Sequence, residues 1–269
     1  MEDITDPSPR SFRGPSSEYK KMQVTTEIEK TGGIKAVDRR QAETAAIAAM
    51  FHFAGRCIEA EADAQLIDWV RGELRQPLES AGLSFGDDFH AADEASLIED
   101  LAEEYTALFV APGCISPYAS VFETGCLFRD PADRAIEAYR EAGWDYQARM
   151  SGEFPDHIGT MLGFYGLLAD SEVECLSRGD IEGADEWNER RETFLVEQLG
   201  QWGPGWCRLA TQAANHVFYR AILQLAEQLL WGELDRVVDR RSMRELVELN
   251  LREPKRLDYD ADFRKASGV

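Results

Sequence analysis

Several features typical of secreted or metal-dependent proteins are absent from this sequence. Its five cysteines are odd in number and form no C-x-x-C pair, so neither a disulfide framework nor a zinc site is expected. Its four histidines are scattered, and no two of them stand four residues apart. We therefore predict reduced cysteines that pack as small apolar side chains, no bound metal and no cofactor.

The common signatures of enzymes are also missing. The sequence contains no glycine-rich phosphate loop and no G-x-S-x-G elbow for a nucleophilic serine. Carboxylates are abundant, but most fall on the polar faces of predicted helices, where they are solvated. These absences favour a binding protein over an enzyme.

No segment has the character of a membrane span or a secretory signal. The longest apolar runs fall short of the 18 uncharged residues that suggest a transmembrane helix. The first residues, MEDITDPSPRSFRGPSSEYKK, contain no apolar core of the kind that signal peptides have. We expect a cytoplasmic protein without stable membrane insertion.

Positive charge is scarce: the formal net charge is −21, and no lysine lies between Lys35 and Lys255. An acidic surface repels nucleic-acid phosphates, so no nucleic-acid partner is expected. It attracts cationic segments of partner proteins instead. The acidity fits either a high-salt cytoplasm or an ordinary solvated acidic surface.

Apolar residues recur at helical spacing along most of the chain, and no long alternating pattern indicates strands. Residues 82–93 are predicted to form a loop, and Asp93 is predicted to cap the helix that follows. The class is therefore all-α, an irregular globule of about eight or more helices. The predicted helices cover 39–61, 63–80, 94–110, 131–142, 155–177, 181–200, 204–231 and 240–251.

The Pro-, Ser- and Gly-rich composition of residues 1–37 predicts a flexible tail. Residues 38–269 are predicted to form one helical domain, with a hinge near 143–155.

Three stretches stand out, at 104–122, 152–169 and 194–230. The first ends a helix with a Pro-Gly turn and continues into a loop with aromatic and hydroxyl side chains. The second, GEFPDHIGTMLGFYGLLA, suits a helix with Pro155 at its first position. Asp156 would then lie in the first turn, where the helix dipole favours an anion, and His157 would be exposed beside it.

Together these stretches resemble the family of redox-enzyme maturation chaperones that includes TorD, DmsD and NarJ. The order and approximate spacing of the motifs agree across about residues 39–232. The sequence departs from the family pattern at Phe154, where relatives have Glu; here Glu153 lies one position earlier. The matching residues are Leu108, Phe109, Pro112, Gly113, Pro117, Tyr118, Ser120, Val121, Pro155, Asp156, His157, Trp202, Pro204, Phe218 and Tyr219.

The resemblance implies an all-helical chaperone that is not an enzyme. Such a chaperone binds the twin-arginine-type leader and the apo form of a molybdopterin oxidoreductase, and it assists cofactor insertion and assembly before export. Carboxylates would meet the arginines, and aromatic side chains would line an apolar groove. The implied peptide-binding residues are Tyr105, Phe109, Pro112, Gly113, Tyr118, Ser120, Phe122, Glu153, Pro155, Asp156 and His157.

Other interpretations stay open. The chain is alternatively a helical adaptor or assembly subunit retained in an oxidoreductase complex, or a small helical enzyme that uses Asp156 and His157. Tyr105 and Phe109 share a helix face and are alternatively core residues. The client enzyme is not identified, and the oligomeric state is open between a monomer and a homodimer.

Overall fold

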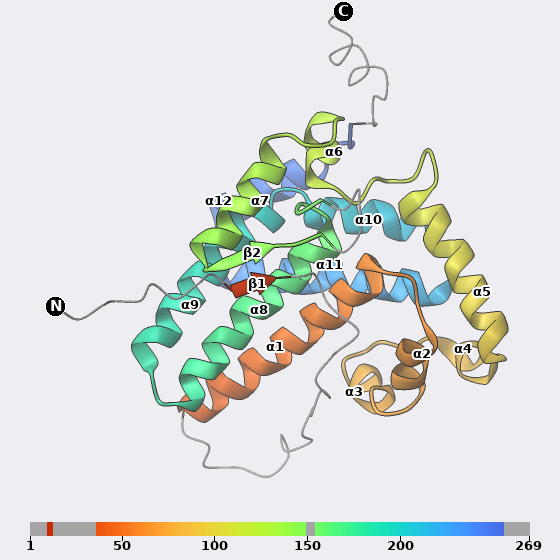
Figure 1. Cartoon of the computed structure of the whole chain (residues 1–269), viewed down its shortest axis with the longest axis horizontal. Coiled ribbons are helices and arrows are strands. Elements are labelled where there is room, and N and C mark those ends of the chain that lie inside the picture. The colour runs from red at the N-terminus through yellow and green to blue at the C-terminus, as the bar shows by residue number, and fades with distance from the viewer. Residues whose placement is uncertain (1–9, 13–35, 149–153, 256–269) are drawn as a thin grey trace, which may run out of the picture.

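The computed structural model describes residues 10–12, 36–148 and 154–255 (Figure 1). These residues form twelve α-helices, two π-helical turns and two strands of three residues each. The prediction of an all-α fold with about eight or more helices is confirmed. Within the described ranges, no helix combines the length and the apolar character needed to cross a membrane.

The first half of the chain supplies one long helix and several short ones. Its helical elements are α1 (Ala36–Glu59), α2 (Ala64–Arg71), α3 (Arg75–Ser80), α4 (Gly86–Ala91), α5 (Glu94–Tyr105), the π-helical turn η1 (Thr106–Val110), α6 (Ala119–Thr124) and α7 (Asp130–Glu141). Helices α2 to α5 lie together at one end of the molecule (Figure 1).

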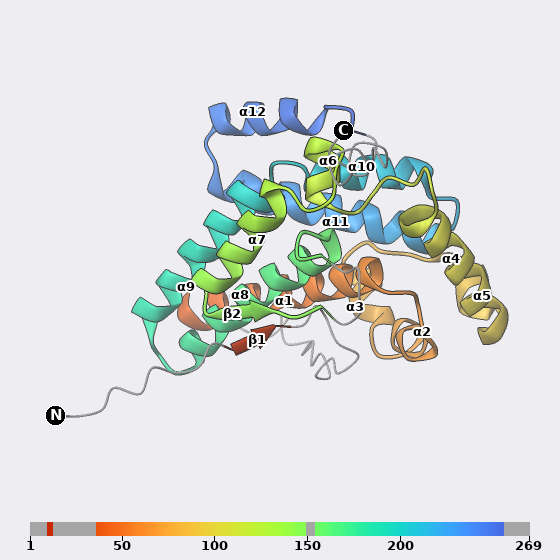
Figure 2. The same cartoon turned by 45° about the horizontal axis from the view of Figure 1, so that its top comes forward.

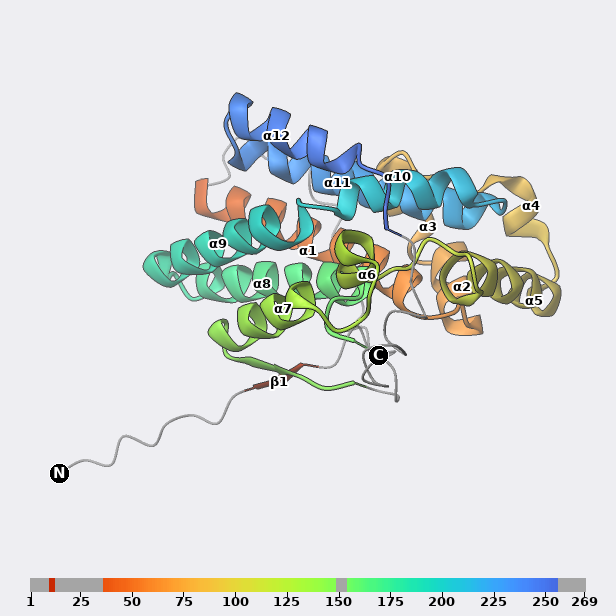
Figure 3. The same ribbon diagram turned by 90° about the horizontal axis from the view of Figure 1, so that it is seen from above.

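The second half contributes longer helices. They are α8 (Ile158–Ser177), α9 (Ile181–Phe194) with the π-helical turn η2 (Leu195–Leu199), α10 (Gly203–Ala213), α11 (Val217–Val237) and α12 (Arg240–Asn250). Seen from above, α10, α11 and α12 form one layer, α1, α8 and α9 lie beneath it, and α7 covers the opposite side (Figure 3). Helix α12 lies on the outside of α11 (Figure 2).

Helices α1 and α8 run side by side and approach unusually closely (Figure 1). Glycines make this approach possible because a side chain on either helix would collide with the other backbone. A Cβ atom on Gly55 would lie 2.8 Å from the carbonyl oxygen of Gly159 and 3.0 Å from the nitrogen of Gly163. A Cβ atom on Gly159 would lie 2.8 Å from the Cβ of Glu59.

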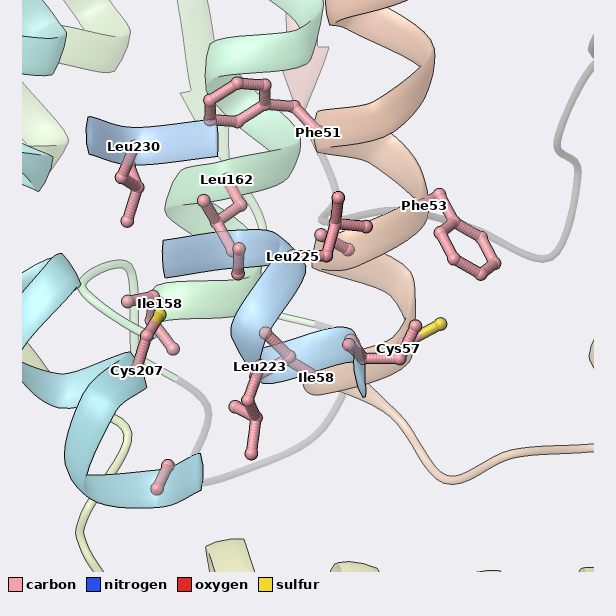
Figure 4. Close-up of a cluster of buried hydrophobic side chains, with 14 of the residues drawn as sticks. Phe51, Phe53, Cys57, Ile58, Ile158, Leu162, Cys207, Leu223, Leu225 and Leu230 are labelled. Carbon is pink, nitrogen blue, oxygen red and sulfur yellow. The ribbon is translucent and has the colours of Figure 1, made fainter. Parts of the chain in front are cut away.

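The hydrophobic core fills the space between these long helices. Figure 4 shows side chains from α1, α8, α10 and α11 meeting there, among them Ile58, Leu162, Cys207 and Leu223. All four are fully buried. Burial of each large apolar side chain stabilises the fold by about 1.5–3 kcal/mol, so this cluster holds the helices in place.

A buried polar network joins α8, α9 and α11 at one side of this core. The guanidinium of Arg191 lies 3.2 Å from a carboxylate oxygen of Glu172 and 2.9 Å from one of Glu233. It also donates to the hydroxyl of Tyr165 at 2.8 Å. Since each buried charge has a partner of opposite sign, the network satisfies groups that would otherwise be costly to bury.

The predicted helix over 63–80 is wrong as a single element, because it divides at Gly72 into α2 and α3. A continuous helix would need a backbone N–H from Pro77, which proline lacks. A helix that restarts at Arg75 places Pro77 in its first turn, where an N–H has no partner within the helix.

Residues 82–93 are not wholly a loop, since α4 begins at Gly86. Its residue Phe89 is buried and stacks on Phe218 of α11, with ring centroids 5.4 Å apart. This distant contact stabilises a helix too short to be stable by itself. The predicted cap is confirmed: the Asp93 side chain accepts a hydrogen bond from the Ser96 N–H.

The helix predicted over 204–231 is also two helices, α10 and α11, which meet at residues 214–216. The carboxylate of Glu104 on α5 accepts hydrogen bonds from the backbone N–H groups of Asn215 and His216. His216 then caps α11, because its Nδ1 accepts from the Phe218 N–H at 3.1 Å.

The N-terminal segment predicted as a flexible tail is described at Arg10–Phe12, which forms strand β1, and at the start of α1. Strand β1 pairs in parallel with β2 (Trp144–Tyr146), with Arg10 opposite Trp144. Of the predicted hinge near 143–155, residues 149–153 lie outside the described ranges. The hinge stays a prediction.

The close approach of α1 and α8 predicts opposite effects for two Gly-to-Ala substitutions. Gly55→Ala should lower the free energy of unfolding by about 1–3 kcal/mol, because the methyl group forces the helices apart. Gly232→Ala in α11, where nothing lies within 4 Å of the new Cβ, should raise it by up to about 1 kcal/mol. Urea denaturation of both variants measures this. A Gly55→Ala protein as stable as Gly232→Ala would contradict the described packing.

Candidate functional site

Two segments far apart in the sequence meet directly before α6 and α8. The backbone N–H of Ala119 donates to the carbonyl oxygen of Asp156 at 3.1 Å. The N–H of Ile158 donates to the carbonyl oxygen of Pro117 at 2.8 Å, so Tyr118 and His157 face each other in an antiparallel bridge. The first and second motifs of the sequence therefore form one structural unit.

The carboxylate of Asp156 lies at the centre of this unit and is fully buried. Its Oδ2 accepts hydrogen bonds from the backbone N–H of Ser120 at 2.7 Å and from the Ser120 hydroxyl at 2.5 Å. Its Oδ1 has no hydrogen-bond partner among the described residues. Burial raises the pKa of Asp156 above its ordinary value, although the bonds from Ser120 act in the opposite direction.

His157 is the N-cap of α8. Its Nδ1 accepts a hydrogen bond from the Gly159 N–H at 3.1 Å, and its side chain is buried. Burial lowers the pKa of His157 to about 4, so the ring is neutral at pH 7 and its Nδ1 is free to accept.

This cap corrects three details of the sequence-based interpretation. Helix α8 begins at Ile158, so Pro155 is not its first residue, Asp156 does not lie in its first turn, and His157 is not exposed. The physical reason is the bridge to Tyr118, which holds His157 in an extended backbone conformation that a helical position would not allow.

Pro155 is buried and is held by α7. Its carbonyl oxygen accepts a hydrogen bond of 2.7 Å from the hydroxyl of Tyr139. The Tyr139 ring packs on Phe164 of α8, with ring centroids 4.3 Å apart. Helices α7 and α8 thus hold in place the residue that directly precedes Asp156.

The remaining predicted residues lie in different surroundings. Tyr105, Phe109 and Phe122 are buried in the core. The Tyr105 hydroxyl donates to the carbonyl oxygen of Glu59, and the Phe109 ring stacks on Trp206. In this conformation these three aromatic side chains contribute to the packing of the core. Their predicted contact with a peptide stays a prediction.

Two other predicted residues lie on an exposed loop after the π-helical turn η1. Pro112 and Gly113 are both exposed, and Gly113 has a φ of +92°, a left-handed conformation that glycine adopts without strain. Glu153 lies outside the described residues. The structure therefore gathers five predicted residues at one place: Tyr118, Ser120, Pro155, Asp156 and His157.

The structure adds one side chain that sequence patterns do not indicate. Phe128 lies in the loop between α6 and α7, is 64% exposed, and packs against Phe154 with ring centroids 4.1 Å apart. The next residue, Arg129, donates its backbone N–H to the Ser120 hydroxyl at 3.4 Å. Nothing in the local sequence marks Phe128, because its place follows from contacts with residues far along the chain.

The described residues offer no evident metal centre. No three histidine, cysteine, aspartate or glutamate side chains among them lie close enough together to hold a metal ion. The five cysteines are all free thiols. Burial raises the pKa of Cys57 to about 12, so this thiol is protonated at neutral pH.

The described residues thus form an all-helical fold in which the two motif segments meet between α6 and α8. A family model described as nitrate reductase delta subunit matches residues 71–208, a little over half of the chain. The chain therefore belongs to this family, whose members are maturation chaperones of molybdenum enzymes of the NarJ and TorD type. The matched range includes both segments that form the site.

The lowered pKa of His157 predicts a dependence of stability on pH. The unfolded chain takes up a proton near pH 6.5 and the folded chain only near pH 4, so the free energy of unfolding decreases as pH falls through this window. Replacement by Asn keeps a capping side chain and removes the titration. His157→Asn should therefore remove up to about 3 kcal/mol of this decrease. Urea denaturation at several pH values tests this, and an unchanged decrease would contradict it.

The raised pKa of Asp156 predicts an effect of opposite sign. The folded state binds the proton of this carboxyl more tightly than the unfolded state, so its contribution to stability decreases as pH rises above 3.8. Asp156→Asn should therefore be at least as stable as the natural protein at pH 7, with an advantage that vanishes in acid. Thermal unfolding of both proteins between acid pH and pH 7 measures this difference in stability. A large loss of stability at pH 7 would show that the Ser120 bonds dominate over burial.

Proposed function

We propose that this chain is a cytoplasmic chaperone for the catalytic subunit of a molybdopterin oxidoreductase. It binds the N-terminal, twin-arginine-type leader and the apo form of that subunit, and it assists cofactor insertion and assembly before export. It has no catalytic turnover of its own.

The observation that carries the proposal is the joining of the two family motifs at one place. Residues 117–120 and 156–158 pair through their backbones, and the Asp156 carboxylate bonds to Ser120 across the join. Both segments lie in the region that matches the family. The joining of both motifs in one folded unit supports this place as the site of the proposed activity.

The electrostatics of the chain support a basic peptide as the partner. The formal net charge is −21, and a buried carboxylate at the site adds negative potential beneath its surface. Asp156 is too buried to contact a peptide directly in this conformation, so it acts by attracting positive charge and by positioning Ser120. Tyr118 is half-buried and presents part of its ring to a bound peptide.

Aromatic and apolar surface completes the recognition that such a leader requires. A leader with two arginines and an apolar stretch needs negative charge beside an apolar surface. Binding must also be reversible, because the leader is released for export. A dissociation constant in the micromolar range meets that need, and it corresponds to a binding free energy of about −8 kcal/mol.

A second function has one observation in its favour. The matching family is described as a subunit, which fits a helical assembly protein retained in the mature oxidoreductase complex. Purification of the mature enzyme distinguishes the two, since a chaperone is absent from it and a retained subunit is present in constant proportion. Association of two copies of this chain stays a prediction.

Titration with the leader peptides of the molybdopterin oxidoreductases from the same organism tests the proposal. We expect micromolar binding of at least one leader by fluorescence anisotropy. Asp156→Asn and Tyr118→Ala should each weaken it by about tenfold, which corresponds to about 1.4 kcal/mol. Glu186→Gln, which removes one exposed negative charge on α9, is the matched control and should change the affinity little.

Far-ultraviolet circular dichroism of each variant establishes that it is folded. Failure of the natural protein to bind any such leader or apoenzyme would overturn the proposed function.

A further inference from the structure

Phe128 combines two unfavourable features that folded proteins usually avoid. Its φ is +52°, the left-handed region, and among the described residues it is the one non-glycine residue with a positive φ. Its side chain is also 64% exposed, so burial does not compensate the backbone strain. Strained residues concentrate at functional sites, where the surrounding structure holds them in place.

The ring of Phe128 begins a row of aromatic side chains along the site. It packs edge-on against the Phe154 ring, with ring centroids 4.1 Å apart. The Phe154 ring packs against the Tyr118 ring, with centroids 5.4 Å apart. The centroid of the Tyr118 ring in turn lies 5.1 Å from the centroid of the His157 ring. The row runs from the exposed loop to the buried cap of α8, so its outer end is a solvent-facing apolar surface joined to the family motif.

Hydrogen bonds hold the loop that carries Phe128. Ser120 provides the link, because its hydroxyl donates to Asp156 and accepts from the Arg129 N–H. The Thr124 hydroxyl donates to the Ser120 carbonyl oxygen at 2.6 Å and accepts from the Cys126 N–H at 3.2 Å. Phe128 is therefore presented by a fixed loop whose anchor is the buried carboxylate of the site.

Acidic side chains flank Phe128 along the chain, and we call them its acidic rim. Asp130 and Asp133 are exposed in the first turn of α7, directly after Phe128 in the chain. Glu123 on α6 lies 3.2 Å from Arg134, and the Arg129 guanidinium donates to the carbonyl oxygen of Phe128. The three acids outnumber the two arginines, so the rim is negative and complements a basic segment.

We infer that Phe128 and Phe154 together form the docking point for a large apolar side chain in a basic leader segment. This inference rests on the proposed function and assigns a contact within it. At position 154 this chain presents an aromatic ring, which packs on Phe128. Its partner leader therefore gains an apolar contact at that position, with its arginines beside the acidic rim.

A Phe128→Gly variant separates binding from folding. Glycine adopts a positive φ without strain, so the midpoint of thermal unfolding should be unchanged or higher. The leader should bind at least about tenfold more weakly, because a central aromatic contact is lost. Phe154→Ala should weaken binding similarly. Ile181→Ala on α9, a partly exposed apolar residue, is the matched control and should leave the affinity unchanged.

A double-mutant cycle identifies the contact on the peptide. The probes are the leader that binds the natural protein and a version whose apolar residues are replaced by Ser. If Phe128 contacts those residues, the losses from Phe128→Gly and from the peptide changes should be less than additive. Fully additive losses would overturn the inference.

The leader titrations distinguish a failure of this inference from a failure of the proposed function. No binding by the natural protein would overturn both. Binding that is unchanged in Phe128→Gly would overturn the docking point and leave the proposed function standing. If sedimentation shows a dimer that Phe128→Gly dissociates, while leader affinity is unchanged, the surface binds a second copy of the chain and the inference is wrong.

Discussion

The bond between the buried carboxylate of Asp156 and Ser120 is the interaction on which the rest of the site depends. It joins the segment before α8 to the start of α6, and through the Ser120 hydroxyl it also reaches the loop of Phe128. A buried carboxylate is costly unless hydrogen bonds satisfy it, and here one of its two oxygens is satisfied. The site therefore keeps a polar group that packing alone would not retain, which fits a role in binding.

Around this bond, the long helices provide a rigid frame. Helices α1 and α8 approach through glycines, and the Arg191 network joins α8 to α9 and α11. Helix α7 holds Pro155 through Tyr139. The contact of Gly159 with α1 and the bond from Tyr139 to Pro155 hold the start of α8, beside His157 and Asp156. The Arg191 network holds the helix further along, at Tyr165 and Glu172.

The sequence predicts the fold class and most helices, because apolar spacing and caps such as Asp93 are local signals. The division at Gly72 has a local signal in Gly72 and Pro77, which the prediction of a single helix over 63–80 overlooked. The division at residues 214–216 depends on bonds from the distant Glu104, which no local pattern reveals. At the site, the sequence motifs single out Asp156, His157 and Tyr118, which the structure brings together. Their burial, and the place of Phe128, follow from pairing with a segment 36 residues away, which no local pattern contains.

Hydrogen exchange of the chain with and without a bound leader peptide tests the central claim most directly. The account predicts slower exchange at residues 115–130 and 154–160 when the leader is present, with α9 unaffected. Protection confined to other parts of the chain, with no change in these two segments, would contradict it.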